Sequence, residues 1–141
     1  MENAVTILQK YWGFEAFRSP QKEIIDTVQS GQDVLGLMPT GGGKSLTFQI
    51  PALQSQGLVL VISPLIALIN DQVAQLKNKN IKAIKLTGGI SQEETINLLD
   101  NCLFGNYALL YISPERLQID WIFEYIKKLP LTLVAIDEAH C

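Results

Sequence analysis

Short apolar runs alternate along the chain with longer stretches in which apolar residues recur at helical spacing. Each run is rich in Val, Ile and Leu and is followed by a turn signal, an order of elements that is typical of a parallel α/β sheet. The runs that predict strands are residues 34–38, 58–62, 83–86, 107–112 and 131–136. Because most of these runs are apolar on both faces, we expect a sheet that is buried between two layers of helices.

Helices are predicted between the strands and ahead of the first one. Those that lie between strands are residues 44–52, 65–77, 92–103 and 121–128, and those that precede the sheet are residues 3–11 and 20–30. Gly31 is a plausible residue to end the second of the leading helices. We therefore expect an N-terminal helical segment over residues 1–31 and a three-layer α/β domain over residues 32–141.

Serine residues mark several of the predicted helix starts. Ser91, with Glu94 three residues later, forms a capping box. Serine is also a favoured N-cap and proline a favoured first helical residue, so the Ser-Pro pairs predict further helix starts. These pairs are Ser19-Pro20, Ser63-Pro64 and Ser113-Pro114.

The second and third Ser-Pro pairs directly follow predicted strands. In a parallel sheet their helix N-termini, with free N–H groups and positive dipole ends, open at the carboxyl edge. Ligands of open α/β sheets bind at that edge. The alternative for each pair is that it serves as a capping device alone.

Composition narrows the class of protein. The 141 residues are 48% hydrophobic and 18% charged, which is ordinary for one globular domain and excludes a disordered tail or a coiled coil. Eleven basic against fourteen acidic residues give a net charge of −3, so any nucleic-acid binding must come from local groups. Neither a membrane span nor a signal peptide is present, so we expect a cytoplasmic protein with no membrane partner. Two Cys and one His are too few for a disulfide framework or a zinc site.

A glycine-rich loop follows the first predicted strand. Its sequence is Met-Pro-Thr-Gly-Gly-Gly-Lys-Ser over residues 38–45, with Met38 where the phosphate-loop pattern has its first glycine. The glycines let successive N–H groups converge on phosphate oxygens, the lysine neutralises phosphate charge and the serine offers a hydroxyl to Mg²⁺. A chance glycine-rich turn is the alternative. The residues predicted to bind the cofactor here are Thr40, Gly41, Gly42, Gly43, Lys44 and Ser45.

The last predicted strand delivers two adjacent carboxylates at its end, Asp137 and Glu138. Asp137, with Ser45, would hold Mg²⁺, and Glu138 would orient and deprotonate an attacking water. Such a pair after a strand is by itself more often the start of a solvated helix. Because the glycine-rich loop falls at the same sheet edge, the combination favours nucleoside triphosphate hydrolysis.

Three stretches together resemble the RecQ family of superfamily 2 DNA helicases. They are Gly-Phe-Glu-Ala-Phe-Arg-Ser-Pro-Gln over residues 13–21, the glycine-rich loop, and Asp-Glu-Ala-His-Cys at residues 137–141. The resemblance runs from about residue 5 to residue 141, and residues 63–73 and 111–117 resemble two further motifs. It implies a RecA-like P-loop fold, incomplete at its C-terminal side, and an ATP-dependent 3′-to-5′ DNA helicase. ATP and Mg²⁺ are the implied cofactors, and single-stranded or forked DNA is the implied partner.

The resemblance also assigns roles to individual residues. Phe14 would stack on adenine, while Arg18 and Gln21 would hydrogen-bond the base; simple core packing is the alternative for Phe14. The implied catalytic residues are Lys44, Asp137, Glu138 and His140, with His140 as a relay between the nucleotide and DNA sites. The implied DNA-binding residues are Ser63, Pro64, Ser113 and Arg116, which is consistent with hydroxyls and helix N-termini contacting phosphates.

Other features limit this interpretation. The family's second motor domain and its arginine finger have no counterpart in these residues, so we expect residues 1–141 alone to be inactive and poorly folded. The basic run of Lys77, Lys79, Lys82 and Lys85 is interpreted as a solvated helix end. Two alternatives stay open: another P-loop NTPase or RNA helicase of superfamily 2, against which Cys141 and the 13–21 pattern argue, and a non-catalytic nucleotide-binding fragment.

Overall fold

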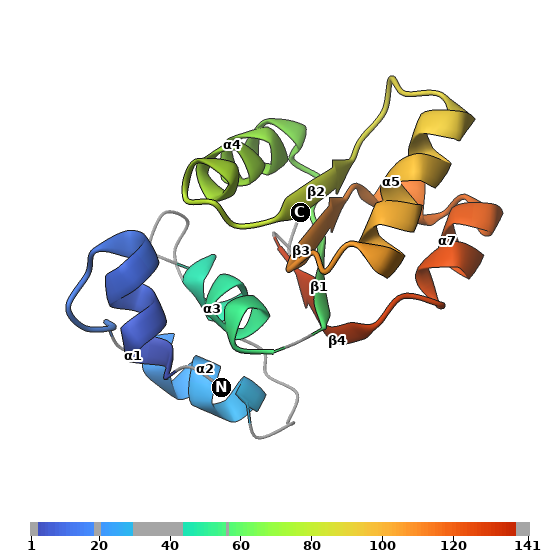
Figure 1. Cartoon of the computed structure of the whole chain (residues 1–141). Coiled ribbons are helices and arrows are strands. Elements are labelled where there is room, and N and C mark those ends of the chain that lie inside the picture. The colour runs from blue at the N-terminus through green and yellow to red at the C-terminus, as the bar shows by residue number, and fades with distance from the viewer. Residues whose placement is uncertain (1–2, 19–20, 30–43, 56, 138–141) are drawn as a thin grey trace. The chain divides into compact units, whose positions relative to one another are not determined.

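The computed structural model describes residues 3–18, 21–29, 44–55 and 57–137. The chain divides into two compact units, Met1–Ser55 and Gln56–Cys141, called unit 1 and unit 2 below. Figure 1 shows the helices of unit 1 in blue to green and the sheet of unit 2 in green to red. The expected division near residue 31 falls among residues that are not described, and it stays a prediction.

Unit 1 is helical. It contains α1 (Ala4–Ile7), the π-helical turn η1 (Leu8–Trp12), α2 (Gln21–Gln29) and α3 (Leu46–Gln54). The helix predicted over residues 3–11 is therefore continued by a wider turn, and it ends at Gly13 with φ of +75°, a conformation that glycine adopts without strain. The buried core of this unit consists of Ile7, Leu8, Ile25, Leu46 and Ile50.

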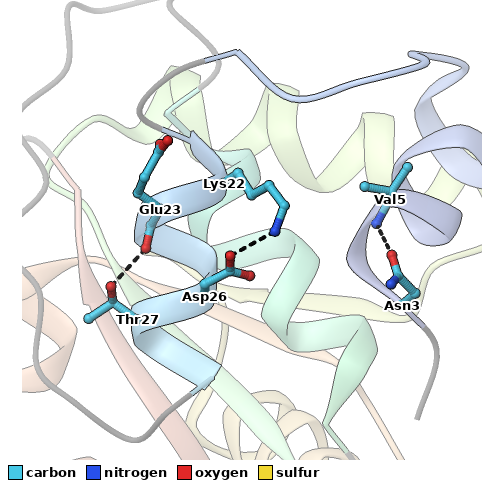
Figure 2. Close-up of polar contacts among 6 residues, drawn as sticks. All are labelled: Asn3, Val5, Lys22, Glu23, Asp26 and Thr27. Atoms are coloured by element: carbon cyan, nitrogen blue, oxygen red, sulfur yellow. Dashed lines mark hydrogen bonds and ion pairs between the residues drawn. The ribbon is translucent and has the colours of Figure 1, made fainter.

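Local polar contacts of unit 1 lie on its surface (Figure 2). Asn3 Oδ1 accepts a hydrogen bond from Val5 N at 2.8 Å, which caps α1. In α2, Lys22 Nζ lies 2.7 Å from Asp26 Oδ2. Because both charged side chains are more than half exposed, the pair contributes only about 0.3–0.5 kcal/mol. Burial of the apolar core therefore stabilises unit 1 far more than these contacts do.

Unit 2 is built on a parallel sheet. Its strands are β1 (Leu58–Ile62), β2 (Ala83–Leu86), β3 (Leu109–Ile112) and β4 (Leu131–Ile136), in the order β2-β3-β1-β4. Each neighbouring pair is parallel. Four predicted strands are confirmed, although β3 begins two residues later than expected. The strand predicted over residues 34–38 lies outside the described residues.

Helices cover both faces of this sheet (Figure 1). α4 (Ile66–Asn78) packs on one face, where Tyr111 Oη donates to Gln72 Oε1 at 2.6 Å. α5 (Gln92–Phe104) and α7 (Asp120–Ile126) pack on the other face, and the short helix α6 (Pro114–Leu117) follows β3. The core on the second face includes Leu60, Leu110 and Ile112 from the sheet. The predicted three-layer α/β architecture is therefore confirmed.

β4 differs from the central strands in its burial. The side chains of β1 and β3 are buried almost without exception, whereas those of β4 alternate between half-buried and exposed. Val134 is 50% exposed and Ile136 is 64% exposed. Within the described part of the chain, β4 pairs with β1 alone, so it forms an edge of the described sheet. The expectation of burial on both faces therefore fails for this strand.

The predicted serine caps are confirmed in α5 and α6. Ser91 Oγ accepts from Glu94 N at 3.1 Å. Ser113 Oγ accepts from Arg116 N at 3.4 Å, with proline in the first turn of α6. Each hydroxyl therefore satisfies one of the unpaired N–H groups at a helix start.

The cap predicted at Ser63-Pro64 is wrong. Leu65 has an extended backbone, with φ of −98° and ψ of 96°, so α4 begins only at Ile66. Ser63 Oγ instead accepts from Leu65 N at 3.2 Å and shapes the turn before the helix. The pair Ser19-Pro20 lies outside the described residues.

Two titratable groups of unit 2 are perturbed. Burial raises the pKa of the Cys102 thiol to about 12, so this cysteine is protonated at neutral pH. The hydrogen bond that Tyr125 Oη donates to Asp100 raises the pKa of the tyrosine to about 12. This bond joins α7 to α5.

No helix in the described ranges is long and apolar enough to cross a membrane.

Gly57 provides a test of the packing between β1 and β4. A Cβ atom at this position would overlap Thr132 Cγ2 and lie 2.7 Å from Pro130 O, whereas at Gly88 it would meet nothing within 4 Å. We therefore expect Gly57→Ala to lower the free energy of unfolding by about 1–3 kcal/mol. Gly88→Ala should change it by less than about 0.5 kcal/mol. Thermal unfolding of both variants measures this difference, and equal melting temperatures would contradict the packing.

Candidate functional site

A cavity in unit 1 brings together three residues that were predicted to recognise a base. Its volume is about 390 Å³, within the range of small-molecule sites. Phe14, Arg18 and Gln21 all contribute to its wall. The complete lining is Leu8, Phe14, Glu15, Ala16, Arg18, Gln21 and Leu46.

Phe14 and Phe17 lie in different surroundings although they are three residues apart. Phe14 is 56% exposed, whereas Phe17 packs against the core of unit 1. The loop that carries Phe14 is held at both ends, since Gly13 N donates to Leu8 O at 3.1 Å and Gln9 Nε2 donates to Glu15 O at 3.3 Å. Core packing therefore does not explain Phe14, and its ring is presented to the cavity.

Gln21 has a structural contact that the sequence analysis missed. Its side chain is buried, and its Oε1 accepts from Arg18 N at 2.8 Å while its own N donates to Arg18 O at 2.7 Å. This is the returning half of a capping box, in which a glutamine side chain bonds a backbone N–H three residues earlier. The three-residue spacing between Arg18 and Gln21 was the feature of the sequence that could have indicated this bond. Gln21 therefore fixes the start of α2 as well as lining the cavity.

Lys44 and Ser45 directly precede α3. Lys44 O accepts from Thr47 N at 3.0 Å and from Thr47 Oγ1 at 2.6 Å, which closes the first turn. Ser45 occupies the N-cap position but makes no capping hydrogen bond with its side chain. The residue after it, Leu46, lines the cavity. The predicted residues Thr40, Gly41, Gly42 and Gly43 lie outside the described residues.

In unit 2, a polar residue follows each strand at the carboxyl edge of the sheet: Ser63, Thr87, Ser113 and Asp137. Ser63, Ser113 and Asp137 are at most 3% exposed. The backbone ladder continues through this row, because Ser63 N donates to Ile112 O at 3.1 Å and Asp137 N donates to Ile62 O at 2.8 Å. The fold therefore holds three buried polar side chains in line at one edge.

The residues proposed for Mg²⁺ fit the chemistry of that ion. Asp137 offers a buried carboxylate and Ser45 a hydroxyl that does not cap its helix. Mg²⁺ prefers oxygen ligands and usually takes only one or two protein carboxylates beside phosphates and water. The described residues contain no cluster of three His, Cys, Asp or Glu side chains that could hold a metal ion. Glu138 and His140 lie outside the described residues.

Arg116, predicted to bind DNA, makes internal hydrogen bonds. Its Nε and Nη2 donate to Thr87 O at 3.2 and 3.1 Å, and Nη2 also donates to Ile90 O at 3.5 Å. The guanidinium therefore ties the loop after β2 to the helix α6. Gly89, inside the tied segment, has φ of +89°. Nothing in the local sequence pattern indicated this contact, because it joins residues that are far apart in the chain.

The comparisons with known proteins identify the family. Residues 18–141 match the family model described as DEAD/DEAH box helicase, and the chain belongs to this family. It is 43% identical over 138 residues to ATP-dependent DNA helicase RecQ of Haemophilus influenzae, and 43% identical over 142 residues to RecQ of Bacillus subtilis. The predicted resemblance to RecQ helicases is therefore confirmed as homology over nearly the whole chain.

The alignments cover nearly all of this chain but only a small part of each relative. The alignments cover 98% and 100% of this chain but 22% and 24% of the two relatives, so the chain spans about a quarter of their length. A crystal structure of a hypothetical ATP-dependent RNA helicase from Sulfolobus tokodaii matches with a TM-score of 0.76 at 24% identity. That match covers 99% of this chain and 42% of the other, and it supports the fold alone.

Replacement of Arg116 tests its role in holding the loop. In Arg116→Lys, a single ammonium cannot reproduce the paired bonds of the guanidinium, so we expect faster amide hydrogen exchange over residues 87–90. Exchange within β1 should stay unchanged. Glu115→Gln, an exposed neighbour, is the control and should not alter the loop. Hydrogen exchange measured by mass spectrometry makes the comparison, and identical exchange in the lysine variant would show that the bonds do not hold the loop.

Proposed function

We propose that this chain is the N-terminal, ATP-binding part of the first motor domain of a RecQ-type DNA helicase. In the whole protein it would bind ATP with Mg²⁺ and couple hydrolysis to 3′-to-5′ unwinding of single-stranded or forked DNA. Membership of the DEAD/DEAH box helicase family implies the use of ATP, and the homology to RecQ supports DNA as the substrate. The observation that carries the proposal is the cavity of unit 1, which joins Phe14, Arg18 and Gln21 to the residue that follows Lys44 and Ser45.

The cavity offers what adenine recognition requires. The exposed ring of Phe14 supplies a face for stacking. The amide of Gln21 has both donors and acceptor lone pairs, of which the bond from Arg18 N uses one position. Arg18 lines the same wall and adds donors. In this proposal Gln21 keeps its structural bond and addresses the base with the rest of its amide.

The phosphates would lie at the start of α3. Lys44 would balance their charge, and the glycine-rich sequence of residues 40–43 would let backbone N–H groups donate to their oxygens. Ser45 and Asp137 would hold Mg²⁺, which when bound neutralises charge on the β- and γ-phosphates. Glu138 would orient a water and accept its proton. His140 would link this site to bound DNA.

DNA would bind along the carboxyl edge of unit 2. The hydroxyls of Ser63 and Ser113 are buried and bond nearby backbone N–H groups, so their contribution is to fix the loops. Pro64 is exposed beside the N-terminus of α4, whose free N–H groups suit a phosphate. In this proposal Arg116 acts through the loop at residues 87–90. These local groups make a net positive charge unnecessary.

Lys44→Ala tests the assignment of the nucleotide site. In the whole protein we expect DNA-stimulated ATP hydrolysis to fall by about 100-fold or more, because the variant loses the charge that stabilises the transferring phosphoryl group. Lys128→Ala, on an exposed lysine after α7, is the control and should keep full activity. The assay is phosphate release with single-stranded DNA and with RNA of the same sequence. If only RNA stimulates hydrolysis by the parent protein, the protein is an RNA helicase. If the parent protein binds ATP but does not hydrolyse it, the domain is non-catalytic.

The two phenylalanines provide a matched test of base recognition. Phe14→Ala should weaken ATP binding about tenfold and leave the melting temperature unchanged, because the ring is exposed and stacking is worth about 1–3 kcal/mol. Phe17→Ala should instead lower the free energy of unfolding by about 1–3 kcal/mol, since that ring packs on the core. Titrations with ATP and CTP, together with thermal unfolding, separate the two effects. Equal losses for ATP and CTP in Phe14→Ala would count against stacking on adenine.

A further inference from the structure

A second cavity lies in unit 2, at the amino-terminal edge of the sheet. Its volume is about 420 Å³. It is formed where the chain leaves α4 and enters β2, and where it enters β3. The lining residues are Lys77, Asn80, Ile81, Lys82, Ala83, Ile84, Leu98 and Tyr107.

This cavity is remote from the edge that carries the proposed DNA contacts. β2 has four residues, and a strand rises by about 3.3 Å per residue, so its first and last residues are about 10 Å apart. The row of polar residues that includes Ser63 and Ser113 lies at the other end of the strands. A molecule bound in the cavity would therefore leave the carboxyl edge accessible.

The floor and the rim of the cavity differ in chemistry. The apolar floor consists of Ile81, Ala83 and Ile84, which are at most 5% exposed, together with the half-buried side chains of Leu98 and Tyr107, which supply its accessible surface. Lys77 and Lys82 are exposed at the rim. Among the eight lining residues none is acidic, although the whole chain carries a net charge of −3. The cavity is therefore a positive, apolar-floored site on an acidic protein.

The rim is structurally fixed on the side of Tyr107. Lys82 Nζ lies 4.5 Å from the centre of the Tyr107 ring and donates to Gly105 O, at the end of α5. A Cβ atom at Gly105 would lie 3.0 Å from the Tyr107 ring, so the ring packs closely against this glycine. The interpretation of the basic run as a helix end holds for Lys77 and Lys79 at the end of α4, but not for Lys82 and Lys85, which lie before and within β2. Lys77 is in the last turn of α4 and makes no such contact among those seen in the structure.

We propose that this cavity docks an acidic segment of a partner protein that inserts one large apolar side chain. An apolar anchor in a pocket with a charged rim is the usual arrangement at the centre of a protein interface. The apolar floor gives a peptide side chain a place to bury, and the two lysines select carboxylates around it. Nucleic acid would satisfy the lysines but would leave the floor uncovered. The inference goes beyond the proposed helicase function and does not depend on ATP.

The probe is the acetylated and amidated pentapeptide Asp-Glu-Phe-Glu-Asp, titrated by calorimetry into the whole protein without nucleotide. We expect saturable binding tighter than about 1 mM, and at least about tenfold weaker binding when Phe is replaced by Ala in the peptide. A second peptide carries benzoylphenylalanine in place of Phe, and after irradiation its crosslinks should map to Leu98 or Tyr107. The absence of saturable binding, or crosslinks elsewhere, would overturn the proposal.

Charge reversal at the rim tests the role of the lysines. Lys77→Glu should raise the dissociation constant of the peptide at least about fivefold, whereas the matched variant Lys128→Glu should change it by less than about twofold. ATP hydrolysis by Lys77→Glu should equal that of the parent protein, which shows that the variant is folded. Equal effects of the two variants would show that peptide binding depends on the overall charge of the protein and not on the cavity, which would contradict the proposal. Competition by oligodeoxythymidine for the crosslink would assign the cavity to nucleic acid and contradict a protein partner.

Discussion

Burial of both faces of the central strands is the constraint on which the rest of unit 2 depends. β1 and β3 present apolar side chains to helices on either side, and their backbone groups are paired with neighbouring strands. A polar group is tolerated within such strands only with a partner, as the Tyr111 hydroxyl has in Gln72, because burying it unpaired costs about 1–3 kcal/mol. Polar chemistry therefore appears where the strands stop. Ser63, Ser113 and Asp137 occupy the first position beyond three strand ends, and the cavity at Lys77 and Tyr107 lies beyond the opposite ends.

The elements that the sequence predicted well are those whose limits are set by local chemistry. β1, β2 and β4 have the expected bounds because each is a continuous apolar run between polar residues. α5 begins where Ser91 caps it. The differences between the predicted and the observed elements also have physical causes. α4 starts late because the Ser63 hydroxyl bonds Leu65 N. Ser113-Pro114 predicted the start of α6 but not its extent, because four residues are too few to show a helical period. The exposure of β4 depends on its place in the sheet, which an apolar pattern does not contain.

In the candidate site, too, features set by neighbouring residues were predictable, whereas contacts between distant residues were not. The resemblance to RecQ helicases assigned Phe14, Arg18 and Gln21 to one site, and the structure brings them to one cavity. Tertiary packing explains why the ring of Phe14 is exposed while that of Phe17 is packed, since both residues lie in a loop without a period. The local sequence did not indicate that Arg116 would bond the backbone of residues 87–90, because that contact forms only when two strands become neighbours. Long-range contacts of this kind decide which motif residues face a ligand and which hold the site in shape.

The bonds of Arg116 have a mechanical consequence. The segment after β2 and the helix α6 are joined by hydrogen bonds in addition to the pairing of β2 with β3. The Arg116 guanidinium, carried by α6, bonds the carbonyls of Thr87 and Ile90, so a displacement of either segment must stretch or break these bonds. A shift of one segment would therefore be opposed by the other, and the two would resist separation as one unit.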